Sequence, residues 1–282
     1  MNVWLKIQKV FFITAKYFLL SFASFLSVVP LVVCVTTSLK SDTEWMNSSK
    51  MALPQNWLNF DNYVTAWKDV NMGLAFRNSG IILVFVLFGS ILFSSMLAYV
   101  LNRFRFRGNN FIRNLFLFAT LIPGIAMQVT VYQIMTSLNL VNSLSGYIIL
   151  LLGSDIITIY IFLQFFENLS KSLDESAIME GCTYFGVFFK ILLPLTKPAI
   201  VTCMILKGVA TYNEYYMANL YLQDKDRLQV VATSLYKFAG PFGNRYNLIC
   251  AGVIITMLPA LIIFILCQKQ IYNGLSAGAI KG

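Results

Sequence analysis

The chain has 282 residues, of which 58% are hydrophobic and only 12% are charged, and its formal net charge is +9. A soluble globular domain carries about 25% charged residues, so this composition excludes an ordinary soluble protein. The positive charge does not indicate nucleic-acid binding, because the basic residues flank apolar runs and form no separate basic stripe or recognition module.

The first apolar run predicts a membrane-spanning helix after a cytoplasmic N-terminus of residues 1–16. It covers residues 17–39 and holds 23 uncharged positions. About 20 apolar residues cross roughly 30 Å of hydrocarbon. The run is longer than a signal-peptide core of about 7–15 residues, and no small-residue cleavage site follows it, so it is not a cleaved signal. Residues 40–78 are predicted to be extracytoplasmic, with tryptophans that suit a partly helical lid at the lipid headgroups.

The second and third spans follow. Span two, about residues 79–101, ends in alternating basic and aromatic residues that are typical of a cytoplasmic anchor. Span three, about residues 111–135, has Pro123 near its middle, and a proline inside a span removes a backbone hydrogen bond. We predict a kinked helix, which either packs against its neighbours or lines a polar route with Gln128 and Tyr132 on one face.

A fourth span is predicted because the uncharged run from residue 114 to residue 154 has 41 positions, too many for one crossing. The polar stretch at residues 136–146 divides this run. Span four is therefore expected at about residues 147–166, with Asp155 inside it.

Two further spans complete the set, at about residues 198–222 and 246–268. The earlier of them contains Lys207 and Glu214, which would lie two turns apart on one helix face. Charges within a span usually face a bundle interior or a wet cavity. These two are expected to pair, to lie at the membrane interfaces, or to contact the solute.

The distribution of positive charge sets the orientation. Six spans put both termini on one side, and that side holds 12 lysines and arginines against eight on the other. This excess identifies the side of the termini as cytoplasmic. We therefore predict an all-α polytopic membrane protein, with a five-helix core over residues 79–268 and a cytoplasmic tail at residues 269–282.

The residues needed for most enzymatic chemistry are missing. The chain has no histidine, the commonest general base and metal ligand, and no phosphate-binding GxxxxGK[ST] loop. We expect no catalytic residue, no metal site and no cofactor in this chain. Its five cysteines are odd in number and lack a CxxC pair, so they are predicted to be small buried hydrophobes.

The segment between spans four and five, about residues 167–197, carries the most informative pattern. Ser172 and Glu175 have the spacing of a capping box, which predicts the start of a helix. Gly181 stands where a left-handed residue would end that helix after about two turns.

A second short helix is predicted directly after the glycine. Thr183 can cap it, its sequence is aromatic, and Pro194 closes it. The predicted object is a helix-turn-helix at the cytoplasmic membrane surface, with Leu173 and Ala177 facing one way and the acidic residues exposed to water.

This spacing resembles the EAA loop of binding-protein-dependent ABC importer permeases. In that family a glutamate begins Glu-Ala-Ala, a glycine follows six residues later, and Leu-Pro closes the segment. The matching positions are Glu175, Ala177, Gly181, Phe188, Leu193, Pro194 and Pro198. Ser176 and Cys182 depart from the pattern, but both are small residues that replace alanines.

The resemblance implies the type I ABC importer permease fold, in which the short helix is a coupling helix seated in a groove of an ATPase subunit. The implied coupling residues are Glu175, Ser176, Ala177, Gly181, Cys182, Phe188 and Pro194. The ATPase subunits, not this chain, would bind ATP and Mg.

Two other stretches look like the maltose-type permeases of carbohydrate importers. They are Asn213 to Tyr216 and the tail Gly-Leu-Ser-Ala-Gly-Ala-Ile-Lys-Gly that ends at Gly282. The resemblance implies an extended tail that reaches the ATPase pair; a disordered tail is the alternative. The tail residues expected to make that contact are Ser276, Ala277, Gly278 and Lys281.

The implied function is import of a sugar or oligosaccharide across a bacterial inner or plasma membrane. The implied partners are a second homologous permease, an ATPase dimer, the lipid bilayer and an extracytoplasmic solute-binding protein that docks on the outer loop at residues 223–247. The candidate residues of the translocation path are Gln128, Tyr132, Tyr212, Asn213 and Glu214. Import of a non-sugar solute and a secondary carrier are the alternatives, although the carrier's long repeated halves are not apparent.

Overall fold

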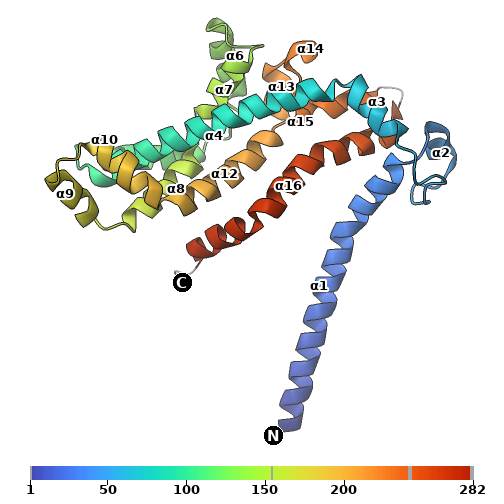
Figure 1. The fold of residues 1–282 in the computed structure, drawn as a ribbon, viewed down its shortest axis with the longest axis horizontal. Helices are drawn as coiled ribbons and strands as arrows, with labels where there is room; N and C mark the ends of the chain where they lie inside the picture. Colours follow the sequence, from blue (N-terminus) through green and yellow to red (C-terminus); the bar gives the residue numbers. More distant parts are fainter. Residues whose placement is uncertain (1, 154, 241–242, 280–282) are drawn as a thin grey trace. The chain divides into compact units, whose positions relative to one another are not determined.

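The structure is a computed structural model, and its described part is helical apart from one short hairpin (Figure 1). It describes residues 2–153, 155–240 and 243–279, with side chains for residues 8–153, 155–240 and 244–268. The chain divides into two compact units, one of residues 1–72 and 235–258 and the other of residues 73–234 and 259–282.

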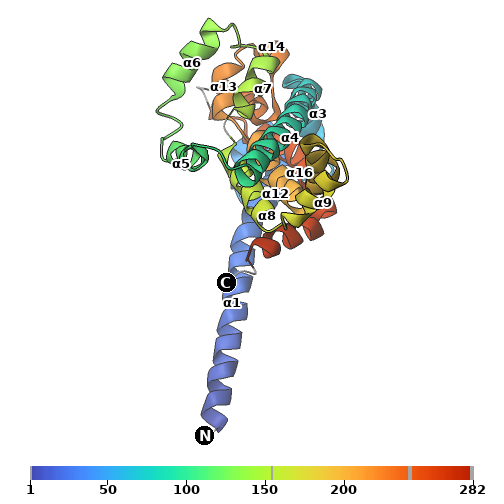
Figure 2. The same ribbon diagram turned by 90° about the vertical axis from the view of Figure 1, so that its left-hand side faces the viewer.

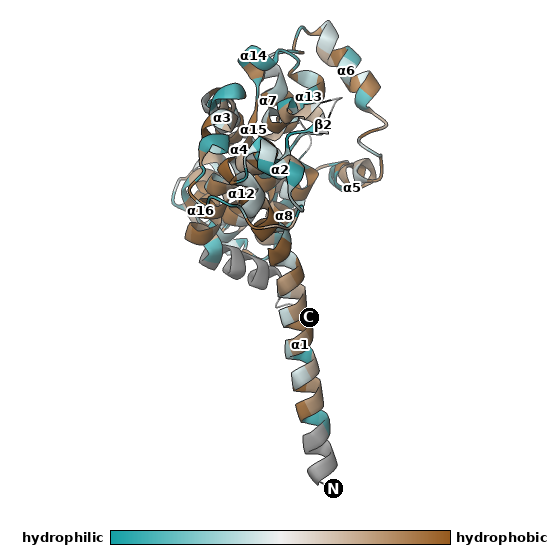
Figure 3. Ribbon diagram, turned by 90° about the vertical axis from the view of Figure 1, so that its right-hand side faces the viewer, coloured by the Kyte–Doolittle hydropathy of each residue, from teal (hydrophilic) through white to brown (hydrophobic). Residues whose placement is uncertain are grey.

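The first unit contains a long apolar helix, α1 (Asn2–Ser38). From Gln8 to Ser38 its mean hydropathy reaches 2.5, and none of its most apolar window is buried in the protein. Phenylalanines and leucines are exposed from Phe11 to Leu31, and the hydropathy colours of α1 show that apolar residues recur through this stretch (Figure 3). Such a surface is stable only against lipid or another protein, so α1 confirms an apolar span at the predicted position, although the helix begins well before residue 17.

The rest of the first unit is held together by a polar network. Asn62 donates to the backbone oxygens of Ser38 and Lys40 at 2.8 and 2.7 Å, and Asn247 donates to Asp42 at 2.6 Å. The segment predicted as a partly helical lid is indeed partly helical. The remaining elements of this unit are α2 (Asp42–Asn47), α3 (Asp61–Asp69), η2 (Leu235–Phe238), β1 (Ala239–Gly240), β2 (Gly243–Asn244) and the first part of α16 (Tyr246–Ala279).

The second unit is built on α4 (Met72–Arg103), which is long and apolar enough to cross a membrane. The other elements of this unit are α5 (Asn109–Thr120), α6 (Gln128–Ser137), α7 (Leu144–Leu152), α8 (Ile156–Glu167), α9 (Ser172–Met179), α10 (Tyr184–Gly186), the π-helix η1 (Val187–Leu192), α11 (Leu193–Leu195), α12 (Lys197–Tyr212), α13 (Tyr216–Tyr221), α14 (Lys225–Leu228) and α15 (Val231–Ser234).

Among the residues that the structure describes, three helices are long and apolar enough to span a membrane, within α1, α4 and α16, and up to five spans result if two bent helix pairs are counted. One pair is α7 with α8, and the other runs from α10 to α12 with a bend of 75° at Thr196. Multiple membrane crossings are therefore confirmed, whereas the number six and the side on which the termini lie stay predictions.

Span three was predicted as one kinked helix, and this was wrong. The structure has two separate helices there, α5 and α6, joined by the irregular segment 121–127 (Figure 2). Pro123 lacks an amide hydrogen, and Gly124 follows it with no side chain to stabilise a helix. Together, the proline and the glycine interrupt the helix, whereas a proline alone usually only bends a helix.

Within the second unit, the loops at the two ends of α4 are far apart. Asn78 donates to the backbone oxygens of Arg227 and Gln229, both at 2.9 Å, whereas Arg103 at the other end of α4 contacts α9. Arg103 follows Asn78 by 25 positions, which correspond to about 37 Å of helix. The segment with the EAA-like pattern and the loop after residue 223 therefore lie a membrane thickness apart (Figure 1).

Candidate functional site

The helix α9 begins close to the predicted place, but by another device. The predicted capping box is wrong. Ser172 is already helical, and the N-cap residue Lys171 makes no side-chain cap bond. The amide of Glu175 donates to the backbone oxygen of Lys171 at 3.1 Å instead. Ser170 takes the role instead, because its Oγ accepts from the amide of Ser172 at 3.2 Å and bonds the Ser172 hydroxyl at 2.7 Å. Glu175 is exposed in the first turn, where a carboxylate favours the helix dipole.

The end of α9 confirms the prediction for Gly181. This residue has φ of +86°, in the left-handed region. Its amide donates to the oxygen of Ile178, and the amide of Cys182 donates to the oxygen of Ala177, both at 2.9 Å. This pair of bonds is a Schellman motif, which satisfies the last carbonyl groups of the helix and reverses the chain.

The second short helix also begins as predicted. The hydroxyl of Thr183 accepts from the amide of Gly186 at 3.2 Å and so caps α10. The chain then widens into the π-helix η1, in which the amide of Leu193 donates to the oxygen of Phe188. The wide turns directly precede Pro194, whose ring would clash with the carbonyl four residues earlier in a regular α-helix. The helix ends only at Leu195, one residue after the predicted stop.

The two helices are fastened to the spans by an aromatic cluster. Phe188 is buried, and its ring lies 5.3 Å from Tyr99 of α4, which in turn contacts Phe166 of α8 at 6.1 Å. Phe104, just after α4, packs on Tyr184 at 5.1 Å. The predicted helix-turn-helix is therefore confirmed, and its buried residues pack in one hydrophobic cluster with residues of α4 and α8.

A buried ion pair, which we did not predict, joins α9 to α4. The Nε of Arg103 lies 3.0 Å from the Oδ2 of Asp174, and the side chains are only 6% and 12% exposed. The contact falls outside hydrogen-bond geometry, so the pair is held by charge. The same guanidinium donates to the backbone oxygens of Phe166 and Leu169 at the end of α8, at 3.2 and 3.1 Å. Arg103 thus ties the ends of two long helices to the short one.

This pair corrects the expected orientation of α9. Asp174 and Ala177 face the protein, while Leu173 is 38% exposed, so Leu173 and Ala177 do not share a buried face and not all the acidic residues are exposed. Ser176 and Glu175 are exposed, and Cys182 is half-buried. Large apolar side chains are also exposed on α9 and on the helix after it, with the exposed Glu175 and Ser176 between them on α9. We call this set the apolar face, and it consists of Leu173, Ile178, Met179, Tyr184, Phe185 and Phe189.

Among the predicted path residues, Gln128 and Tyr132 lie together on α6 but contact α13 and the residues after it. Gln128 is buried, and its Oε1 accepts from the hydroxyl of Tyr221 at 3.1 Å. The hydroxyl of Tyr132 accepts from the side-chain amide of Gln223 at 2.9 Å. Both polar groups are therefore already satisfied in this structure, as a structural contact between two helices requires.

Tyr212 and Glu214 lie apart from that pair. They line a cavity of about 10 Å³ together with Tyr147, and no hydrogen-bond partner reaches the Tyr147 hydroxyl within the described residues. A cavity of this size holds about one water molecule, not a sugar. Asn213, at the end of α12, donates to the backbone oxygen of Val209 at 3.0 Å.

The charges expected in span five do not pair with each other. The helix α12 ends at Tyr212, so Glu214 lies beyond it and accepts from the amide of Met217 at 2.9 Å. Lys207 instead lies 3.6 Å from the Oδ2 of Asp155 and donates to the backbone oxygen of Leu151 at 3.0 Å. Asp155 caps α8 and accepts from the hydroxyl of Thr158 at 2.8 Å. Lys207 therefore forms an ion pair, as was expected of a charge within a span, but its partner is Asp155 and not Glu214.

Replacing Lys207 with methionine is expected to destabilise the chain by about 1–3 kcal/mol, because the carboxylate of Asp155 keeps its bonds from Thr158 but loses its cation. The measurement is thermal unfolding of the detergent-solubilised protein. The exposed Lys190, changed to methionine, is the control and should leave the transition in place. Equal transitions for the two variants would contradict a stabilising role of the Lys207 pair.

The segment predicted as the outer loop, residues 223–247, contributes residues to both units. In the second unit, Asp224 caps α14, and its carboxylate accepts from the Arg227 side chain at 2.6 Å. This bond is the main cause of a lowered pKa of Asp224. In the first unit, the ammonium of Lys237 donates to the backbone oxygen of Asp69.

The tail is not extended as predicted, because α16 continues through Ala279 and so includes Ser276, Ala277 and Gly278. Lys281 lies outside the described residues. The expected contact of these residues with an ATPase stays a prediction.

Residues 90–275 match the family described as binding-protein-dependent transport system inner membrane component. The chain belongs to this family, and it is a multi-pass membrane protein. The match covers the buried Arg103–Asp174 pair, the Schellman turn at Gly181 and the whole of the apolar face.

Relatives of known name match almost the full chain. The arabinooligosaccharides transport system permease protein AraQ of Halalkalibacterium halodurans is 31% identical over 93% of this chain and 94% of its own. The melibiose/raffinose/stachyose import permease protein MelC of Bacillus subtilis is 30% identical over 90% and 91%. A crystal structure of a bacterial ABC transporter involved in the import of the acidic polysaccharide alginate has a chain with the same fold, with a TM-score of 0.82, 20% identity, and coverage of 93% of this chain and 97% of that one.

Proposed function

We propose that this chain is a permease subunit of an ATP-driven importer for a sugar or oligosaccharide, and that it transmits the closure of an ATPase dimer through α9. The sugar class is supported by the names of the relatives, which include permeases for arabinooligosaccharides and for raffinose-type sugars. The proposed partners are a second permease, two ATPase subunits that hold ATP and Mg, and an extracytoplasmic solute-binding protein at the outer loop.

The observation that carries this proposal is the contrast between the two faces of α9. Its inner face is fixed to α4 and α8 by the Arg103–Asp174 pair, while on its outer face Met179 is 88% exposed and Phe185, just beyond the turn, is 67% exposed. Exposed clusters of large apolar side chains mark interaction sites. A segment that is fixed to the spans and exposes large apolar side chains is suited to receive force from a partner and to pass it on.

A charged residue on the apolar face should therefore weaken the complex. Met179→Asp is expected to reduce co-purification of the proposed ATPase partner by roughly tenfold, because a carboxylate would be desolvated in the interface. Met46→Asp is the matched control, since Met46 is 76% exposed on α2 and lies outside the proposed contact. Equal recovery of the ATPase with both variants would exclude the apolar face as its binding site.

The importer assignment itself is tested by transport. The complete complex in proteoliposomes is expected to take up an oligosaccharide in the presence of ATP and the binding protein, and a panel that includes arabino-oligosaccharides and raffinose is the first choice. Uptake driven by a proton or sodium gradient without ATP would contradict the proposal.

A further inference from the structure

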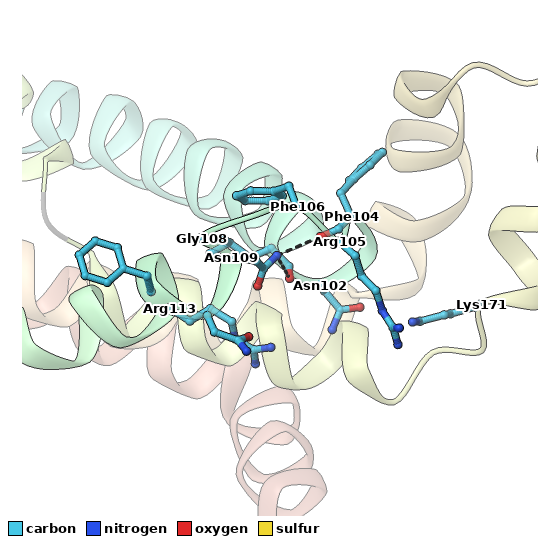
Figure 4. A pocket seen from close by; sticks show the side chains of 11 residues that line it. Asn102, Phe104, Arg105, Phe106, Gly108, Asn109, Arg113 and Lys171 are labelled. Atoms are coloured by element: carbon cyan, nitrogen blue, oxygen red, sulfur yellow. Dashed lines mark hydrogen bonds between the residues drawn. The ribbon is translucent and has the colours of Figure 1, made fainter.

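A cavity of the second unit lies at the end of α4. It has a volume of about 610 Å³ and is bounded by the end of α4, the start of α5 and the residue that precedes α9 (Figure 4). We call it the basic cavity. Its lining residues are Leu101, Asn102, Phe104, Arg105, Phe106, Gly108, Asn109, Asn110, Phe111, Arg113 and Lys171.

The charges around the basic cavity are unbalanced. Three cationic side chains line it and no carboxylate does. Arg113 has a partner, because its guanidinium lies 2.6 Å from Glu167, but Arg105 and Lys171 have no acidic partner within the described part of the chain. Figure 4 shows the ends of these two side chains directed towards one another. Two like charges that converge repel each other unless an anion lies between them.

The backbone at the cavity adds to this positive field. Gly108, with φ of +94°, is the N-cap of α5 and offers no side chain to cap it, and the first turn of α5 contains no acidic residue. The positive end of the helix dipole is therefore not neutralised by the protein. Asn109 does not fill the space, because its side-chain amide is held by the backbone oxygens of Leu101 and Phe104, both at 2.9 Å.

The position of the cavity indicates the source of the anion. It adjoins the last residues of α4, a helix of membrane-spanning length, so it lies at the level of the lipid headgroups. Phe111 and Phe106, which line it, are 69% and 42% exposed, so apolar rings stand beside the cationic groups. Cations with adjacent exposed apolar surface suit a lipid phosphate with its acyl chains better than a free phosphate ion.

We propose that the basic cavity binds the phosphate headgroup of an anionic membrane lipid, between Arg105, Lys171 and the start of α5. The lipid would neutralise the two converging cations and support the connection between α4 and α5. None of the residues that line the basic cavity belongs to the apolar face, so its test does not depend on the importer assignment.

Native mass spectrometry of the full-length chain measures this binding. The protein is equilibrated with mixed micelles of phosphatidylglycerol and phosphatidylcholine, and the lipid that it retains is counted. We expect the unmodified chain to prefer phosphatidylglycerol, and Arg105→Gln/Lys171→Gln to lower that preference by roughly tenfold to thirtyfold. Arg107→Gln/Lys197→Gln removes the same charge from exposed positions outside the cavity and should keep the preference.

Three results would overturn the proposal. The first is an equal preference in the two double variants. The second is displacement of phosphatidylglycerol by inorganic phosphate alone, which would indicate a free anion site. The third is loss of the preference when the complete complex with its ATPase subunits is measured, which would show that a protein segment occupies the cavity. If the cavity double variant does not fold, Lys171→Gln alone provides the same comparison with Lys197→Gln.

Discussion

Replacing Asp174 with alanine is expected to destabilise the second unit by about 3–5 kcal/mol and to abolish ATP-driven uptake. The variant would leave the guanidinium of Arg103, which is 6% exposed, buried without a counter-charge. The two bonds from Arg103 to the end of α8 would remain, so the loss would fall on the link between α9 and α4. The measurements are thermal unfolding of the solubilised protein and uptake by the reconstituted complex.

The ion pair between Arg113 and Glu167 is the matched control. It has a shorter separation of 2.6 Å, but its side chains are 32% and 49% exposed, so Glu167→Ala should cost less than about 1 kcal/mol. The double variant Arg103→Met/Asp174→Leu removes both buried charges and should recover most of the stability. If it recovers stability but not uptake, the charged link itself serves coupling. If Asp174→Ala is no more harmful than Glu167→Ala, the buried pair has no special role.

The local features of this site could be read from the sequence because each depends on a few neighbouring residues. A glycine that must adopt a positive φ and a threonine that caps a helix three residues ahead are set by nearby backbone geometry, and both Gly181 and Thr183 were predicted correctly. The bonding at the start of α9 was predicted wrongly because Ser170 and Ser172 offer the same hydroxyl two residues apart, and only the path of the preceding chain decides which one accepts a backbone amide.

The tertiary features could not be read in the same way. Asp174 lies 71 positions after Arg103, and no spacing rule relates them. Likewise, the sequence showed isolated charges in the spans but not which of them pair. Lys207 lies beside Asp155 rather than Glu214, because α12 ends before Glu214 and α8 packs beside α12. The carboxylate of Asp174 lies on the inner face of α9, so Leu173 does not share a buried face with Ala177 as its apolar character had suggested.

Replacing Gly181 with valine is expected to lower ATP-driven uptake by roughly tenfold or more while the protein still inserts into the membrane. A β-branched residue at φ of +86° costs about 1–3 kcal/mol, and the Schellman turn would have to open to relieve it. A Cβ atom at this position would have no other atom within 4 Å, so a steric clash cannot be the cause. The loss would come from the backbone angle between α9 and α10, which sets where the apolar face points.

Gly181→Asn separates this cause from the mere presence of a side chain. Asparagine adopts the left-handed region readily, so this variant should retain most of the uptake although it adds more polar bulk than valine. Membrane insertion and co-purification of the ATPase are measured in parallel, because a valine variant that binds the ATPase but does not transport places the defect in force transmission rather than in assembly. Equal uptake by the valine and asparagine variants would mean that the direction of the turn does not matter, and the proposed role of α9 as a rigid link would fail with it.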